Sequence, residues 1–173
     1  MVAAGSYMSH TFFEVNEVRA YLITFRSHGT WLHGDSRGSI DRLHNRYGSP
    51  LLPCSAQRLK LNFTRLKNSP VRLTSEQRQI VEAGIRETCK FRNWDLWTIN
   101  VRSNHVHAVV SAQCKPEKIL IAFKANATRK LKEAGCWGSN DGPWAKGGSK
   151  RYLWTEKDVL NAVAYAEYDQ GES

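Results

Sequence analysis

Two strand-like segments joined by only two residues place the strongest constraint on the fold of this chain. Residues 94–102 read WDLWTINVR and residues 105–112 read HVHAVVSA, and both are rich in β-branched and aromatic side chains. A Ser-Asn connection of this length suits a tight turn between antiparallel neighbours. The sequence therefore predicts a β-hairpin, and with it an antiparallel sheet.

The segments around the hairpin alternate between strand and helix patterns. Aromatic and β-branched runs predict two further strands, and apolar residues three and four positions apart predict helices. In chain order we expect a strand at 19–26, a helix at 75–91, the hairpin, a helix at 116–135 and a strand at 151–154. A last helix is expected to start with a capping box formed by Thr155 and Asp158 and to end at Gly171. This order predicts an α+β fold: a ferredoxin-like antiparallel sheet with helices on one face, plus a C-terminal helix.

The last predicted helix has an apolar side and a polar side. Its apolar stripe is expected to contain Val159, Leu160, Val163 and Ala166. Tyr165 and Asp169 are four residues apart on another side, so they lie one turn above each other. Two interpretations are open: tyrosines that border the core with their hydroxyls in water, or a phenol nucleophile beside a carboxylate or amide.

Length and cysteine spacing indicate a single domain, residues 1–173, without disulfides or a zinc ribbon. A chain of 173 residues with 41% hydrophobic residues can form a core unaided. Its four cysteines are irregularly spaced and form no CxxC pair. No segment has the length of a membrane span or the pattern of a signal peptide. We therefore expect no membrane partner and a cytoplasmic, nucleoid-associated location.

The charge balance favours a polyanionic partner. The chain has 25 Lys and Arg against 16 Asp and Glu, a net charge of +9, which attracts nucleic acid. Between residues 37 and 72 there are eight basic residues and one acid, within a basic loop insertion at about 32–73 that is expected to be irregular, with a short extended segment at 59–66. This insertion is either a solvated loop or a surface that binds phosphates. The candidate DNA-binding residues are Arg42, Arg46 and Arg65 in the insertion, and Lys124, Arg129 and Lys130 on the exposed side of the helix at 116–135.

Two histidines occupy alternate positions of the second hairpin strand. Side chains in a strand alternate between faces, so His105 and His107 point to one face while Val106 and Ala108 point to the other. The pair is either part of a solvated sheet face or two ligands of one metal ion.

The histidine segment resembles a known motif. Residues 104–110, NHVHAVV, match the His-hydrophobic-His motif of the HUH endonuclease superfamily. YLITFR, FKANATRKL, RYLW and AVAYAEYDQGE lie where they would in REP-associated tyrosine transposases, single-tyrosine relatives of the small insertion-sequence transposases. The resemblance spans about residues 18–171.

This resemblance implies an enzyme of the HUH type, a tyrosine transposase that cleaves and rejoins single-stranded, hairpin-forming DNA. Tyr165 matches the nucleophile and would form a 5′-phosphotyrosine intermediate, with Tyr168 as the rival. His105 and His107 would hold Mg²⁺ or Mn²⁺. The family has Asn or Gln about one turn after its tyrosine, whereas here the position four residues on is Asp169, followed by Gln170, so either could be the third ligand.

Several alternatives stay open at the level of sequence. Tryptophans in predicted loops, Trp31, Trp137 and Trp144, either stack on unpaired bases or pack on the protein. The protein could be a homodimer, and Tyr165 could serve its own histidines or those of a partner. A nucleic-acid-binding module that no longer cleaves is the main rival function. A small-molecule metalloenzyme without DNA affinity is a third.

Overall fold

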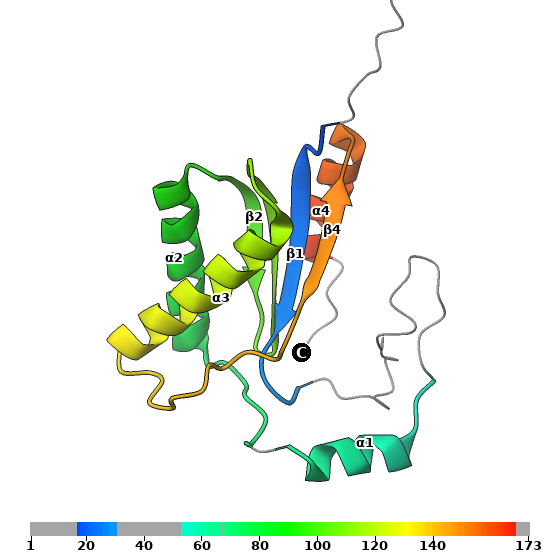
Figure 1. Ribbon diagram of the computed structural model, residues 1–173, viewed down its shortest axis with the longest axis vertical. Coiled ribbons are helices and arrows are strands. Elements are labelled where there is room, and N and C mark those ends of the chain that lie inside the picture. Colours follow the sequence, from blue (N-terminus) through cyan, green and yellow to red (C-terminus); the bar gives the residue numbers. More distant parts are fainter. Residues whose placement is uncertain (1–16, 31–52, 67, 169–173) are drawn as a thin grey trace, which may run out of the picture.

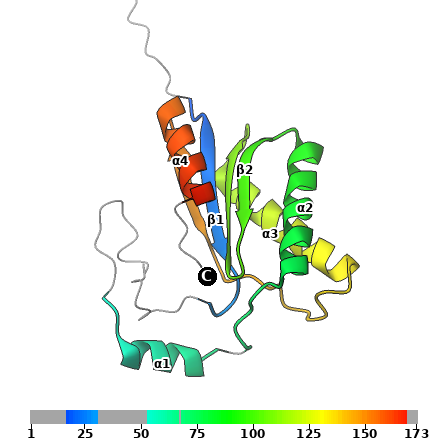
Figure 2. The same ribbon diagram turned by 180° about the vertical axis from the view of Figure 1, so that it is seen from behind.

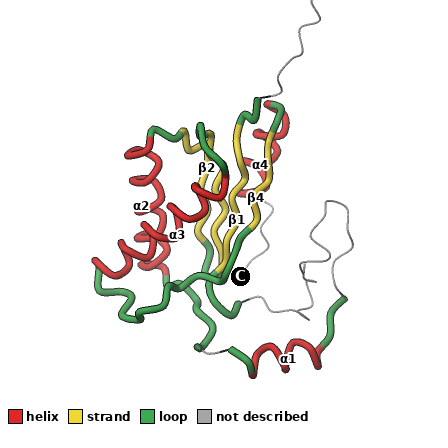
Figure 3. The backbone as a smooth tube through the Cα atoms, viewed as in Figure 1, coloured by secondary structure: helices red, strands yellow, loops and turns green. Residues whose placement is uncertain are grey.

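Four antiparallel strands form a single sheet in the computed structural model, which describes residues 17–30, 53–66 and 68–168. The strands are β1 (Ala20–Arg26), β2 (Asp95–Val101), β3 (His105–Ser111) and β4 (Ser149–Leu153), coloured yellow in Figure 3. Their order across the sheet is β2-β3-β1-β4, so the first and third strands lie at the centre. The predicted ferredoxin-like arrangement is confirmed.

The hairpin and the two flanking strands form close to where the sequence predicts them. β2 and β3 pair antiparallel, and the turn between them is closed by the Arg102 amide, which donates to the His105 carbonyl at 2.8 Å. β4 begins two residues before the predicted 151–154 segment. A Cβ atom at Gly148 would lie 2.8 Å from the backbone oxygen of Thr24, so the chain enters β4 at a point where only glycine fits against β1.

Helices α2 (Ser75–Arg92) and α3 (Pro116–Glu133) cover one face of the sheet (Figure 1). Both were expected from their apolar spacing. Thr74 caps α2 through a reciprocal bond pair with Gln77, and α2 ends at Asn93 in the left-handed region, with φ of 53°. The core between sheet and helices contains the buried side chains Ile23, Phe25, Val81, Ile85, Val106, Ala108, Val110, Ile119, Phe123, Ala127 and Leu131.

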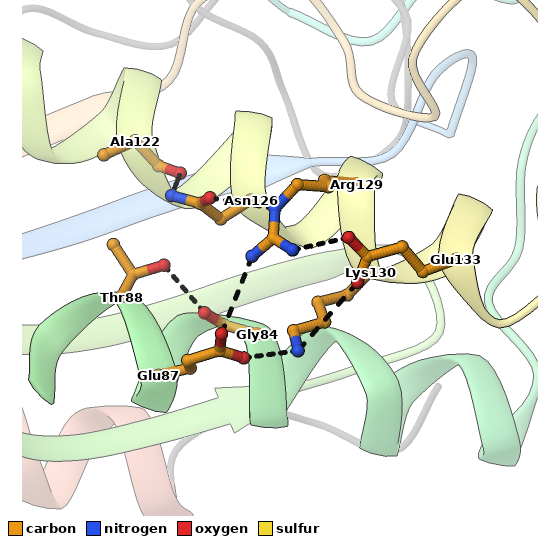
Figure 4. A network of polar contacts seen from close by, with 8 residues as sticks. All are labelled: Gly84, Glu87, Thr88, Ala122, Asn126, Arg129, Lys130 and Glu133. Carbon is orange, nitrogen blue, oxygen red and sulfur yellow. Dashed lines mark hydrogen bonds and ion pairs between the residues drawn. The ribbon is translucent and has the colours of Figure 1, made fainter. Parts of the chain in front are cut away.

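A glycine sets the distance between α2 and α3. A Cβ atom on Gly84 would lie 3.1 Å from Cγ of Lys130, so the missing side chain lets α3 approach closely. The carbonyl of Gly84 also accepts a hydrogen bond from the Thr88 hydroxyl at 2.7 Å (Figure 4). The two helices therefore form one closely packed layer.

Helix α4 (Glu156–Tyr168) lies on the opposite face of the sheet (Figure 2). The predicted capping box is present: the Thr155 amide donates to the Asp158 carboxylate at 3.0 Å, and the Asp158 amide donates to the Thr155 hydroxyl at 3.1 Å. The predicted end at Gly171 lies outside the described residues.

The apolar stripe of α4 differs from the prediction at one position. Leu160 is 57% exposed, whereas Val159, Ala162 and Ala166 are buried. Buried positions three or four residues apart form one side of a helix, and Leu160 is turned about 100° away from Val159. The smaller core on this face therefore consists of α4 residues with Ala20, Leu22, Val109 and Leu153.

The basic insertion contains a helix where an extended segment was expected. α1 (Ala56–Thr64) begins after Ser55, whose hydroxyl accepts from the Arg58 amide. The prediction was wrong because apolar residues alternate with polar ones along this segment, which imitates a strand. In the helix that forms, Leu61 and Phe63 are 48% and 57% exposed, and no residue of α1 is buried. Across the described ranges, no helix is long and apolar enough to cross a membrane.

Candidate active site

The two histidines lie on the face of the sheet that α4 covers. Val106 and Ala108 contribute to the opposite core, as the strand alternation predicts. The ring centroids of His105 and His107 are 4.7 Å apart with an interplanar angle of 79°. His107 is only 5% exposed, so this imidazole sits in a largely dry environment.

Neighbouring polar groups orient both imidazoles. Thr24 lies opposite His107 in the β1–β3 register, and its hydroxyl is 2.8 Å from His107 Nδ1. His105 Nδ1–H donates to the side-chain oxygen of Asn104 at 2.6 Å, which places the basic lone pair on Nε2. Metal-bound histidines are characteristically held in this way through their second ring nitrogen.

Sequence reasoning missed Thr24 and Asn104. Thr24 lies between the apolar residues Ile23 and Phe25 of β1, which was an available signal for a residue on the site's face. Its partner could not be identified, because the β1–β3 register joins positions 83 residues apart. Asn104 was visible only as half of a turn. Its carbonyl also accepts from the Ser27 amide at 2.9 Å, which ties the turn to the end of β1.

Tyr165 lies beside His107. Their ring centroids are 5.6 Å apart and the rings meet edge to face, at 81°. The Tyr165 side chain is 42% exposed, so it contacts the imidazole and remains accessible to a substrate. Tyr168, the rival, is 80% exposed on the following turn. The structure thus brings together the two predicted histidines and the preferred tyrosine.

Two hydrogen bonds from β2 fix the last turn of α4 over this site. Asn100, which lies opposite His107 in the sheet, donates from Nδ2 to the Ala166 carbonyl at 2.7 Å. The Thr98 hydroxyl donates to the Glu167 carboxylate at 2.9 Å. Tyr165 is therefore positioned by contacts made to the two residues that follow it in the sequence.

His105 and His107 are the described residues that could hold a metal ion. Imidazole nitrogens are common ligands of divalent transition metals, and a neighbouring group lies at the Nδ1 atom of each ring. Metal binding by this pair stays a prediction. Within the residues that the structure describes, no group of three or more His, Cys, Asp and Glu side chains gathers. Asp169 and Gln170 lie outside the described residues, so the third ligand stays a prediction.

Lys124 does not have the expected exposed ammonium group. Its Nζ donates to the Ala145 carbonyl at 2.8 Å and to the Gly147 carbonyl, and it lies 5.8 Å from the centre of the Phe25 ring. Burial lowers the pKa of the Lys124 ammonium group. The prediction of exposure was wrong because the glycine-rich loop between α3 and β4 folds over this side chain. Lys124 holds that loop against α3.

Arg129 and Lys130 lie in an ionic network on the α2–α3 layer. Lys130 Nζ is 2.5 Å from the Glu87 carboxylate, and Arg129 is 2.6 Å from that of Glu133 (Figure 4). α3 and α4 are on opposite faces of the sheet, so these cations are not beside the histidines (Figures 1 and 2). Their DNA-binding role stays a prediction, and it concerns a different surface from the site.

The remaining basic candidates lie at the lower end of the sheet in Figure 1 or outside the described residues. Arg65 is the exposed residue that ends α1. Arg42 and Arg46 lie outside the described residues. Arg26, which was not singled out from the sequence, lies opposite His105 in the β1–β3 register and hence on the same face of the sheet. Arg26 therefore adds a basic residue to the face that carries the histidines.

The structure thus places a histidine pair and a tyrosine from a C-terminal helix on one face of a ferredoxin-like sheet. The sequence profile described as "Transposase IS200 like" matches residues 60–157, more than half of the chain. The chain belongs to the IS200-like transposase family. The matched range contains His105 and His107 and ends before Tyr165, so the position of Tyr165 is known from the structure alone.

Two solved structures are also similar to this chain. One is a REP-associated tyrosine transposase bound to a REP hairpin: 12% identity, 96% of this chain and 70% of that chain covered, TM-score 0.49. The other is a proposed transposase from Deinococcus radiodurans: 12% identity, 99% of this chain and 100% of that chain covered, TM-score 0.44. No curated protein matches the chain in sequence. Structural similarity at this level carries no functional information about this chain.

Proposed function

We propose that this protein cleaves and rejoins single-stranded, hairpin-forming DNA, with the Tyr165 hydroxyl as the nucleophile. Membership of the IS200-like transposase family supports the class of reaction. The observation that carries the residue assignment is the edge-to-face contact of Tyr165 with His107, at 5.6 Å between ring centroids. This contact places a phenol next to an imidazole pair on one face of the sheet.

The proposed step exchanges one phosphodiester for another. The Tyr165 oxygen forms a bond to the phosphorus, and the bond from phosphorus to the 3′ oxygen of the leaving strand breaks. The phenol loses its proton and the 3′ oxygen gains one, which leaves a 5′-phosphotyrosine and a free 3′-hydroxyl. Because the tyrosyl linkage is still a phosphodiester, attack by a 3′-hydroxyl can rejoin the DNA without a nucleotide cofactor.

His105 and His107 are the residues that would hold a divalent cation, Mg²⁺ or Mn²⁺, with Asp169 or Gln170 as the third ligand. A cation bound there would supply Lewis-acid activation of the scissile phosphate. Thr24 holds the imidazole of His107 in place, and Asn104 holds that of His105, in each case through the Nδ1 atom of the ring. Arg26, on the same face, adds the positive charge that orients a phosphate.

The test is a covalent adduct between protein and DNA. End-labelled hairpin DNA with single-stranded flanks, incubated with the protein and Mn²⁺, should give an adduct that survives denaturation. Tyr165→Phe should abolish this adduct, because it removes one oxygen and keeps the ring that contacts His107. Tyr168→Phe is the matched control and should leave adduct formation within about twofold of wild type. An adduct retained in Tyr165→Phe and lost in Tyr168→Phe would reverse the assignment.

The same assay separates the proposal from its alternatives. Wild-type protein that binds hairpin DNA and forms no adduct across a broad hairpin library would instead be a binding module. Because Tyr165 contacts a histidine of its own chain, we also propose that one chain forms the whole site. A mixture of Tyr165→Phe with His107→Ala should then stay inactive, whereas activity restored on mixing would show a site shared between chains.

A further inference from the structure

A cleft of about 660 Å³ opens beyond the C-terminal end of β1. Three segments line it: the loop after β1, the segment after α1, and the glycine-rich loop between α3 and β4. Backbone hydrogen bonds join them, from Val71 to the His28 carbonyl at 2.8 Å and from His28 to the Pro143 carbonyl at 2.7 Å. The cleft is thus a built feature of the fold.

Two tryptophans provide the apolar lining of the cleft. Trp137 Nε1 donates to the Asp141 carbonyl at 2.7 Å, and Trp144 Nε1 donates to the Thr128 hydroxyl at 3.0 Å. Trp144 also meets Phe25 edge to face, with ring centroids 4.9 Å apart. With their N–H groups bonded to the protein, both indoles offer the cleft carbon surface, which suits a flat aromatic ligand.

A buried imidazole nitrogen adds a specific polar group. His28 lines the cleft, and its Nε2 atom is buried without a hydrogen-bond partner in the described part of the chain. Buried polar atoms in proteins are nearly always paired, so this nitrogen is a candidate partner for a polar atom of a ligand in the cleft. The edges of all four DNA bases carry both donors and acceptors that can bond to an imidazole nitrogen.

Two exposed cations complete the lining. Arg65, at the end of α1, and Lys146, in the glycine-rich loop, both line the cleft. The acid in the lining, Asp141, accepts a hydrogen bond from Asn68 at 3.3 Å. Aromatic surface, a ring nitrogen and two cations together match a nucleotide, which has a flat base and an anionic phosphate.

We propose that this cleft binds one unpaired nucleotide of the bound DNA strand, outside the cleavage site. The base lies against Trp137 with an edge toward His28, and its phosphate lies between Arg65 and Lys146. This inference rests on the proposed function, because it takes DNA as the occupant. Trp144 of the cleft packs on Phe25, on the face covered by α2 and α3. His28 of the cleft follows Ser27, whose amide donates to the carbonyl of Asn104, the residue that orients His105 on the other face, so the cleft and the histidines are linked around the end of the sheet. One strand can therefore reach both sites.

The first test compares two double variants of equal charge. Arg65→Ala with Lys146→Ala removes the two cations of the cleft, and Lys90→Ala with Lys118→Ala removes two exposed cations from the α2–α3 layer. The probe is fluorescein-labelled single-stranded DNA of randomised sequence, followed by anisotropy at several salt concentrations. We expect the Kd of the cleft variant to rise about tenfold, and the slope of log K against log salt to fall by roughly 1.4. Equal weakening in the two double variants would overturn the proposal.

The second test asks whether the cleft recognises a base. His28→Ala and Trp137→Leu should each weaken binding of ordinary single strands by about fivefold or more. Both variants should bind an abasic strand, which has the same backbone without bases, as well as wild type does. Identical losses with ordinary and abasic DNA would overturn the base-binding assignment. If circular dichroism shows that Trp137→Leu does not fold, the binding results for His28→Ala decide this test.

Two further readouts identify the source of the nucleotide and separate this proposal from the proposed function. Deoxynucleoside monophosphates should compete weakly; tight binding of free nucleotides that is lost in the cleft variants would make this a small-molecule site instead. The adduct assay with Tyr165 is scored separately. If the wild type forms the adduct and the cleft variants bind DNA as well as wild type does, only the proposed nucleotide site is overturned. If the cleft variants weaken DNA binding and the wild type forms no adduct, only the proposed cleavage is overturned.

Discussion

The two faces of the sheet are made by the same strands and have different roles. On the face covered by α2 and α3, β1 and β3 contribute only apolar side chains to the core, such as Ile23, Phe25 and Val106, all at most 1% exposed. On the face covered by α4, the same two strands contribute Thr24 and His107. Neighbouring residues of one strand point to opposite faces of the sheet, so one packs in the core and the next belongs to the candidate site.

The helices differ in the same way. α2 and α3 are each 18 residues long and bury large side chains such as Ile85 and Phe123. α4 has 13 residues and buries only Val159 and two alanines. Small buried residues let α4 lie low on the sheet, and that position brings Tyr165 against His107. The face with less apolar burial is the one that positions reactive groups.

The largest expected effect comes from one substitution on each face. His107→Ala should reduce adduct formation at least about a thousandfold, since it removes a predicted metal ligand, and should lower the free energy of unfolding by only about 1–2 kcal/mol. Phe123→Ala should lower that free energy by about 3–5 kcal/mol because it leaves a cavity in a fully buried site. Its adduct yield per folded molecule should stay near that of wild type. Denaturant unfolding and the adduct assay, run on both variants, measure this double contrast.

A reversal of these effects would contradict the division of roles. Specifically, Phe123→Ala that folds and yet fails to form the adduct would place catalysis under the control of the α2–α3 face. Calorimetry with Mn²⁺ provides an independent check on His107→Ala. Unchanged metal affinity in that variant would remove His107 from the ligand set.

The features of the fold that could be predicted from the sequence are those that depend on residues close together in the chain. The hairpin, α2, α3 and the capping box of α4 were predictable because turns, caps and apolar spacing act within a few residues. The same local signals misled at α1, where alternating Leu61 and Phe63 suggested a strand although the Ser55 cap starts a helix. They also misled at Leu160, where apolar character did not mean burial.

The site was only partly visible in the sequence for the same reason. The His-x-His spacing is local, so a shared face for both histidines could be predicted. The Thr24–His107 bond and the position of Lys124 under the glycine-rich loop are long-range contacts, which depend on strand register and loop path. No spacing rule could supply them. Asp169 and Gln170 stay predictions made from the sequence.

A middle-sized effect is expected from the bond that orients His107. Thr24→Val keeps the shape of the side chain and removes the hydroxyl that lies 2.8 Å from His107 Nδ1. We expect adduct formation or Mn²⁺ affinity to fall about 10- to 100-fold, because such orienting bonds tune a ligating imidazole. Thr88→Val, in α2 on the other face of the sheet, removes the bond to the Gly84 carbonyl and serves as the matched control. If both variants lose activity equally, the Thr24 hydroxyl has no specific role in orienting His107.

The smallest effects concern two exposed carboxylates, one on each side of the sheet. Hydrogen bonds from Thr155 hold the pKa of the Asp158 carboxyl below its usual value, and the hydrogen bond from Lys130 lowers the pKa of Glu87. A carboxyl whose pKa is lowered by folding stabilises the protein above its unfolded pKa, and this contribution is lost as the pH falls through the folded value. Asp158→Asn and Glu87→Gln should therefore each lower the Tm slightly at neutral pH. Both differences from wild type should disappear at strongly acidic pH.

These two carboxylates should nevertheless differ in their effect on activity. Asp158 starts α4 by accepting from the Thr155 amide, so Asp158→Asn loosens the helix that positions Tyr165 and should reduce the adduct yield a few-fold. Glu87 pairs with Lys130 between α2 and α3, away from the histidines, so Glu87→Gln should leave the yield unchanged. Thermal melts across pH, with adduct assays at neutral pH, measure both quantities. A loss of activity in Glu87→Gln as large as in Asp158→Asn would show that the two faces are coupled, because an ion pair at the outer surface of one helical layer would then control a tyrosine held on the other.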